Sequence, residues 1–101
     1  MDLPNMTDLV QAYIANLQPK AAGQIQGTAK LVITGHGSVM LDETGAHADD
    51  GLADVVLIAS DEVFRNILSG DQNPMMAFMS GKLKIEGNPQ RALKVSSILI
   101  D

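Results

Sequence analysis

The sequence contains no cysteine, which excludes disulfide bonds and cysteine-based metal sites. Aromatic residues make up only 3% of the chain and tryptophan is absent, which argues against a surface that stacks nucleic-acid bases. No apolar run approaches the roughly 20 residues that a helix needs to span a bilayer. The first residues lack the basic segment and apolar run of a secretory signal peptide. We therefore expect a cytoplasmic protein that does not bind nucleic acid.

The 101 residues are 46% apolar, which predicts one domain over 1–101 with a single core. The net charge of −5 is distributed unevenly. Residues 42–71 hold eight acids and one base, whereas residues 82–101 hold two acids and four bases: Lys82, Lys84, Arg91 and Lys94. One interpretation is two solvated faces of opposite charge. The other is that the basic region contacts an anionic head group or a membrane.

Hydrophobic periodicity in the first half predicts a helix followed by strands. Apolar residues at helical spacing indicate a helix over 5–17, with Asn5 or Thr7 as its N-cap and Pro19 as its end. Alternating or β-branched runs then occur within 28–34, 39–42, 46–49 and 53–59. The turn sequences GHG, ETG and DDG separate them. This pattern predicts an antiparallel meander of up to four strands.

The second half carries clear helix boundaries. Ser60 is the expected N-cap of a helix that ends at Gly70, and Asn73-Pro74 begins a second, shorter helix. Residues 82–86 alternate as a strand, and Asn88-Pro89 begins a last helix. The predicted order is α-β-β-β-β-α-α-β-α. A mainly antiparallel sheet covered by helices on one face, an α+β fold, satisfies that order.

Residue types that support catalysis are few. His36 and His47, with Asp49 and Asp50 nearby, are two candidate metal ligands across a hairpin. No third ligand is well spaced, so we interpret them as exposed loop histidines. No nucleophile elbow and no phosphate-binding loop are present. We expect no enzymatic activity, no metal and no cofactor.

The segment PMMAFM holds three methionines and Phe78 within residues 74–79. Methionine is unbranched and adaptable, and it recurs where a surface must accept varied apolar shapes. One interpretation places these side chains in the core. The other, which explains the excess of methionine better, makes them a flexible lip over an apolar cavity.

Residues 53–94, ADVVLIASDEVFRNILSGDQNPMMAFMSGKLKIEGNPQRALK, resemble the C-terminal half of the sterol carrier protein 2 family. The shared features are the strand that ends in Ser60-Asp61, the helix that ends at Gly70, Asn73-Pro74, the run SGKLKI and Gly87-Asn88. The short chain is similar to free-standing, prokaryotic-type members. The resemblance implies a five-stranded sheet with an apolar cavity between sheet and helices. It also implies non-catalytic binding of fatty acids, acyl-CoA, phospholipids or sterol-like lipids, with or without their transfer.

The resemblance also implies which side chains line the cavity. The predicted lipid-binding set is Tyr13, Leu57, Phe64, Leu68, Met75, Met76, Phe78, Met79, Leu83 and Leu93. The expected partner is an apolar small molecule, with at most transient membrane contact. The alternative is an accessory subunit that docks a protein partner and supports an enzyme acting on an apolar substrate.

Overall fold

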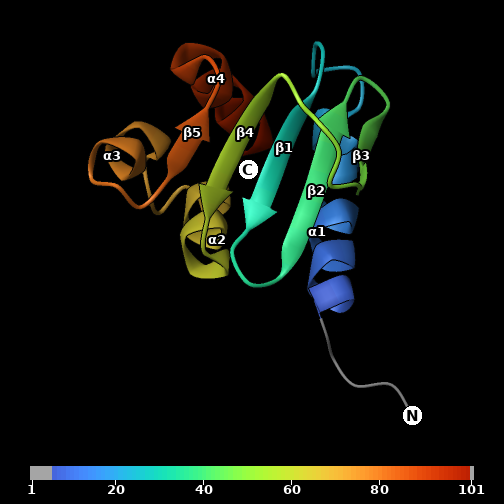
Figure 1. The fold of residues 1–101 in the computed structure, drawn as a ribbon, viewed down its shortest axis with the longest axis horizontal. Coiled ribbons are helices and arrows are strands. Elements are labelled where there is room, and N and C mark those ends of the chain that lie inside the picture. Colours follow the sequence, from blue (N-terminus) through green and yellow to red (C-terminus); the bar gives the residue numbers. More distant parts are fainter. Residues whose placement is uncertain (1–5, 101) are drawn as a thin grey trace.

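The computed structural model describes residues 6–100, with side chains from Leu9 onward. The elements are α1 (Met6–Ala21), β1 (Ala29–Ile33), β2 (Gly37–Asp42), β3 (Gly45–Ala48), β4 (Val55–Ala59), α2 (Asp61–Ser69), α3 (Pro74–Met79), β5 (Lys84–Glu86) and α4 (Pro89–Leu99). This order confirms the predicted one. In Figure 1 the sheet lies in front of α1, α2 and α4, while α3 lies at its side, beside β5.

The five strands form one sheet in the order β3-β2-β1-β4-β5. The strands β1, β2 and β3 are the expected meander, but β4 pairs with β1 in parallel, with Leu31 opposite Leu57. The expectation of a fourth antiparallel meander strand is therefore wrong. The other three strand pairings are antiparallel, so the sheet is mainly antiparallel, as predicted.

The parallel pairing of β1 with β4 has a hydrophobic cause. Both strands place alternate apolar side chains in the core. The half-buried residues on the other face are Val32, Val56 and Ile58, together with the charged Lys30. Strands that are apolar on both faces are most stable at the centre of a sheet. The short strand β3, with its sequence GAHA, takes the edge instead. Residues 49–54 then cross the front of the sheet to reach β4 (Figure 1).

The hydrophobic core fills the space between the sheet and the helices. Leu31, Ile33 and Leu57 from the sheet, and Leu17 and Phe64 from the helices, are each no more than 2% exposed. They belong to one continuous cluster of buried side chains. The helices therefore cover one face of the sheet, as the sequence predicts.

Helix α1 continues through Pro19 to Ala21, so the predicted end at Pro19 is wrong. Proline lacks the N–H that would bond the carbonyl of Ala15, four residues earlier. Both residues are exposed, so water can reach that carbonyl and the loss is tolerated near the end of the helix. The predicted N-caps, Asn5 and the side chain of Thr7, lie outside the described part of the chain.

The later helices begin where their capping residues predict. Ser60, Asn73 and Asn88 each accept a hydrogen bond from a backbone amide in the first turn. Gly70 ends α2 in the left-handed conformation with φ of 88°, which glycine adopts without steric cost. These boundaries therefore follow from local chemistry.

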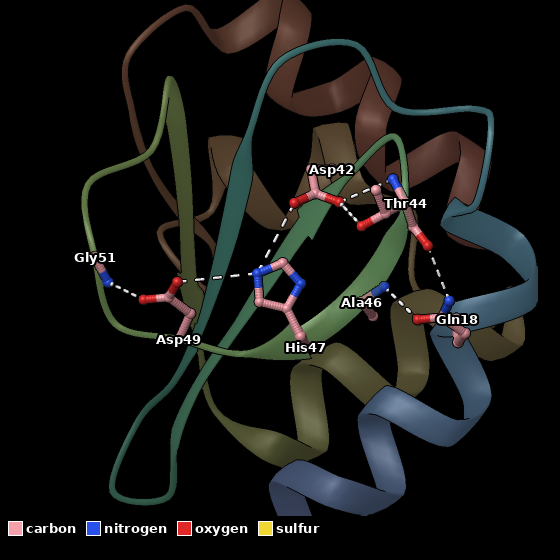
Figure 2. Close-up of polar contacts among 7 residues, drawn as sticks. All are labelled: Gln18, Asp42, Thr44, Ala46, His47, Asp49 and Gly51. Atoms are coloured by element: carbon pink, nitrogen blue, oxygen red, sulfur yellow. Dashed lines mark hydrogen bonds and ion pairs between the residues drawn. The ribbon is translucent and has the colours of Figure 1, made fainter.

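The hairpin of β2 and β3 is fastened to α1 by one side chain, Gln18 (Figure 2). Its amide nitrogen donates to the carbonyl of Thr44 at 3.0 Å, and its oxygen accepts from the backbone amide of Ala46 at 2.6 Å. Because Gln18 satisfies a backbone acceptor in the turn and a backbone donor in β3, it holds the hairpin against the helix.

Candidate functional site

A groove of 460 Å³ lies between α4 and the loop that joins α1 to β1. Its volume falls within the roughly 300–1,000 Å³ range of ligand pockets. The lining residues come from the loop, from Asn88 just before α4, and from α4 as far as its penultimate residue: Gln24, Ile25, Gln26, Asn88, Gln90, Arg91, Lys94, Val95 and Ile98. The groove therefore joins two segments that are far apart in the sequence.

The groove has an apolar floor. Ile25 and Val95 are buried, at 2% and 5% exposure, and Ile98 is half-buried. On α4, residues 91, 94, 95 and 98 share one face because they are three, four and seven positions apart. That spacing places two cations, Arg91 and Lys94, beside the apolar strip formed by Ile25, Val95 and Ile98. The site thus combines apolar surface with positive charge, as a lipid with an acidic head group would require.

The two cations of the groove have different roles. The Arg91 guanidinium donates to the carbonyl of Gln26 at 2.5 Å and lies 3.4 Å from a carboxylate oxygen of Asp54. It therefore ties α4 to the loop. Lys94 is exposed, and its ammonium has no hydrogen bond or ion pair within the part of the chain that the structure describes. Lys94 is thus the charge available to a ligand.

The ten residues of the predicted lipid-binding set lie outside this groove. Five are in the core at no more than 6% exposure: Tyr13, Leu57, Phe64, Leu68 and Leu83. Phe78 and Leu93 are half-buried. The methionines are at the surface, where Met75, Met76 and Met79 are 49%, 64% and 77% exposed. The structure divides the set between core and surface, and its contact with a ligand stays a prediction.

Sequence reasoning missed the loop side of the groove. The run Gln24-Ile25-Gln26 places a lone apolar residue between two polar ones, and in a loop that pattern marks an anchored segment. Nothing in the sequence indicates that Ile25 and Val95 line one groove, because only the folded chain places them there. The sequence predicts Arg91 on a solvated basic face, whereas in the structure it is partly buried and paired with Asp54.

Tyr13, a member of the predicted set, has a structural role. Its hydroxyl donates to a carboxylate oxygen of Asp61 at 2.7 Å, and its ring meets Phe64 edge-on at 6.4 Å between centroids. Burial, followed by the hydrogen bond to Asp61, raises the pKa of Tyr13 far above its usual range. Asp61 also pairs with Arg65 at 2.8 Å. Tyr13 therefore stays protonated and joins α1 to α2.

The histidines do not assemble a metal site. His36 lies in the turn between β1 and β2, whereas His47 lies within β3, so the expectation of two loop histidines is wrong for His47. Figure 2 shows His47 between two carboxylates, with its Nε2 3.8 Å from Asp42 and 3.9 Å from Asp49. Among the described residues, no group of three His, Cys, Asp or Glu could hold a metal ion.

Asp42, which lies beside His47, stabilises the turn between β2 and β3. The hydroxyl and the backbone amide of Thr44 both donate to Asp42, and the hydroxyl contributes most to lowering the pKa of that carboxyl. The polar contacts of Asp42 beside His47 therefore stabilise the β2–β3 hairpin.

Within residues 6–100 no helix has the length and apolarity to cross a bilayer.

Known proteins resemble this chain in sequence and in fold. Hydroxysteroid dehydrogenase-like protein 2 of Bos taurus is 37% identical over 92 residues, which cover 91% of this chain and 21% of that protein. This chain thus spans about a fifth of the length of that relative. A fatty acid-binding protein of Yarrowia lipolytica is 38% identical over 55 residues, 54% of this chain and 43% of that protein.

The apo structure of sterol carrier protein 2 from Yarrowia lipolytica superposes with a TM-score of 0.74. It is 24% identical and covers 97% of this chain and 93% of that one, so it shows the shared fold. Residues 8–100 match the SCP-2 sterol transfer family as a whole. The match spans nearly the entire chain, and the chain belongs to the SCP-2 sterol transfer family.

Proposed function

We propose that this chain binds, without catalysis, a lipid with one acyl chain and an acidic head group, such as a fatty acid. The observation that carries the proposal is the groove at α4. There Lys94, which has no partner among residues 6–100, lies beside the apolar strip of Ile25, Val95 and Ile98. Two comparisons support it: the family is described by sterol transfer, and one relative is named a fatty acid-binding protein.

The apolar strip supplies most of the affinity in this proposal. Burial of an acyl chain stabilises a complex by about 25 cal/mol for each Å² of apolar surface removed from water. An exposed ion pair such as that of Lys94 with a carboxylate contributes about 1 kcal/mol or less. Lys94 therefore orients the lipid, and the tail holds it.

The predicted lipid-binding set suggests a second location, between the sheet and the helices. There Phe64 and Leu68 are buried within the core. A tail that enters this location must displace packed side chains, whereas the groove is already open. We therefore propose the groove as the first binding site and the interior as the alternative.

The test is displacement of a fluorescent fatty acid from purified protein. Lys94→Gln should weaken fatty-acid binding about threefold to fivefold, and Ile98→Asn should weaken it more, because it interrupts the apolar strip. Lys84→Gln is the matched control. Lys84 is exposed on β5, outside the groove, and its ammonium has no partner in the described part of the chain. It should leave the affinity unchanged.

Two outcomes would redirect the proposal. If both groove variants bind as wild type does while Phe78→Ala binds weakly, the interior is the site. If native mass spectrometry shows a persistent protein partner and no co-purified lipid, the accessory-subunit function replaces lipid binding.

We also propose that the chain acts in the cytoplasm, which fractionation of cells producing it would test.

A further inference from the structure

One of the two cations that line the groove at α4 is already neutralised. Among the described lining residues, only Arg91 and Lys94 are charged. The Arg91 guanidinium lies 3.4 Å from a carboxylate oxygen of Asp54, which is outside the lining. The ammonium of Lys94 has no partner within residues 6–100. The groove therefore presents the compensated pair of Arg91 and Asp54 and one free positive charge.

Asp54 is held beside Arg91 by Thr28, which directly precedes β1. The backbone amide of Asp54 donates to the Thr28 hydroxyl at 2.9 Å. The carboxylate of Asp54 accepts from the Thr28 backbone amide at 3.0 Å, through the same oxygen that faces Arg91. These two hydrogen bonds fix both the backbone and the side chain of Asp54. The ion pair is thus held in place, although the side chains of Arg91 and Asp54 are 40% and 54% exposed.

The loop that precedes β1 is also shaped for this ion pair. The carbonyl of Gln26 accepts from the Arg91 guanidinium at 2.5 Å. Gly27 has a φ of 72°, in the left-handed region that favours glycine. A Cβ at this position would collide with the guanidinium of Arg91 and with the carboxylate of Asp54. Both loop residues therefore favour the pairing of Arg91 with Asp54.

We propose that Asp54 determines which head groups the groove accepts. By neutralising Arg91 it leaves Lys94 as the free cation, so the groove selects lipids whose head group carries a single negative charge. The second charge of a phosphate monoester finds no free cation there and loses hydration near the Asp54 carboxylate. Specificity of this kind uses a repulsive element as well as an attractive one. The inference deepens the proposed function and rests on it, because the groove must bind the lipid.

A variant can remove the charge of Asp54 and keep its shape. Asp54→Asn retains a side-chain oxygen that accepts from the Thr28 amide, but it no longer neutralises Arg91. Arg91 is then a second uncompensated cation on the same helix face as Lys94. A head group with two charges gains from this second cation, whereas a head group with one charge already has Lys94. The preference between the two head groups therefore reports the role of Asp54.

Two competitors with the same tail measure this preference. Near pH 8 dodecyl phosphate carries nearly two negative charges, because the second pKa of a phosphate monoester is about 6, whereas dodecanesulfonate carries one. Each competitor displaces a fluorescent fatty acid from the purified protein. Wild type should bind the phosphate no more tightly than the sulfonate. Asp54→Asn should shift the ratio of the two affinities about threefold to fivefold toward the phosphate.

Two further variants separate charge from structure. Asp54→Glu keeps the negative charge but alters the packing, so the ratio should stay at its wild-type value whatever the absolute affinities. Asp49→Asn changes the net charge of the chain by the same amount as Asp54→Asn. Asp49 accepts from the Gly51 amide and lies 3.9 Å from His47, outside the groove lining, so its replacement should leave the ratio unchanged. A purely structural role of Asp54 would instead weaken both competitors equally in Asp54→Asn and in Asp54→Glu.

The outcomes distinguish this inference from the proposed function. If Asp54→Asn leaves the ratio unchanged while Ile98→Asn weakens both competitors, the role of Asp54 is overturned and lipid binding in the groove stands. A wild type that already binds the phosphate about tenfold more tightly than the sulfonate would overturn that role too. If Ile98→Asn binds both competitors as wild type does, the groove is not the binding site, and the proposed function fails together with the inference.

Discussion

At the scale of single residues, Tyr13 offers a clean test of how α1 is joined to α2. Tyr13→Phe removes the hydroxyl that donates to Asp61 and should lower the free energy of unfolding by about 1 kcal/mol at neutral pH. Because folding raises the pKa of Tyr13, its contribution is fully present below the unfolded value, near pH 10, and is lost as the pH rises further. Urea unfolding at neutral and alkaline pH measures the difference.

The ionisation of Tyr13 can be observed directly. The chain has one tyrosine and no tryptophan, so tyrosinate absorbance reports this residue alone. We expect the absorbance to appear only when the protein unfolds at high pH. Tyrosinate that forms near pH 10 in a protein still folded by circular dichroism would show that the hydrogen bond to Asp61 is not maintained in solution.

At the scale of elements, Pro19 lies inside α1, whereas the sequence predicts that it ends the helix. Its replacement should therefore change the stability of α1. Pro19→Ala restores the donor for the carbonyl of Ala15 and should raise the free energy of unfolding by about 1 kcal/mol. Proline costs about 3 kcal/mol in a helix interior, but the gain is smaller near a helix end. Part of this gain in stability is offset, because alanine gives the unfolded chain more conformational entropy than proline does.

Pro89 is the matched control for Pro19. It occupies the first turn of α4, where proline is favoured because that position needs no intrahelical N–H. Pro89→Ala should therefore leave stability unchanged or slightly lower, as measured by the same urea titration. If Pro19→Ala behaves as Pro89→Ala does, α1 ends before Pro19 in solution.

At the scale of the whole molecule, ligand binding should stabilise the fold. The groove joins a loop near residue 25 to α4, and Arg91 bonds Gln26 across 65 positions of sequence. A ligand that contacts both sides of the groove therefore links the loop at residues 24–26 to α4. At 100 times its dissociation constant, a ligand adds about 2.7 kcal/mol.

That stabilisation can be measured by thermal unfolding. For a domain of this size it corresponds to a rise in Tm on the order of 10 °C. Differential scanning calorimetry with a fatty acid should show the rise. Lys94→Gln should need a higher concentration of fatty acid for the same rise, and an unchanged Tm at saturating fatty acid would contradict binding to the native state.

The sequence by itself determined the features that depend on neighbouring residues. Helix starts at Ser60, Asn73 and Asn88 follow from side chains that satisfy amides within the next turn. The end of α2 at Gly70 follows from the left-handed conformation that glycine adopts freely. The motifs of residues 53–94 also indicated the family, because they combine these boundaries with a specific alternation.

Only the tertiary structure decided which distant segments meet. The parallel contact of β1 with β4 depends on competition among strands for the centre of the sheet, and local alternation does not encode that choice. The groove exists because the fold places Ile25 of the loop and Val95 of α4 in one lining. The exposure of Met76 depends on how α3 is rotated against the core. Local pattern shows that a side chain is apolar, but burial depends on what the remaining chain covers, which is a property of the whole fold.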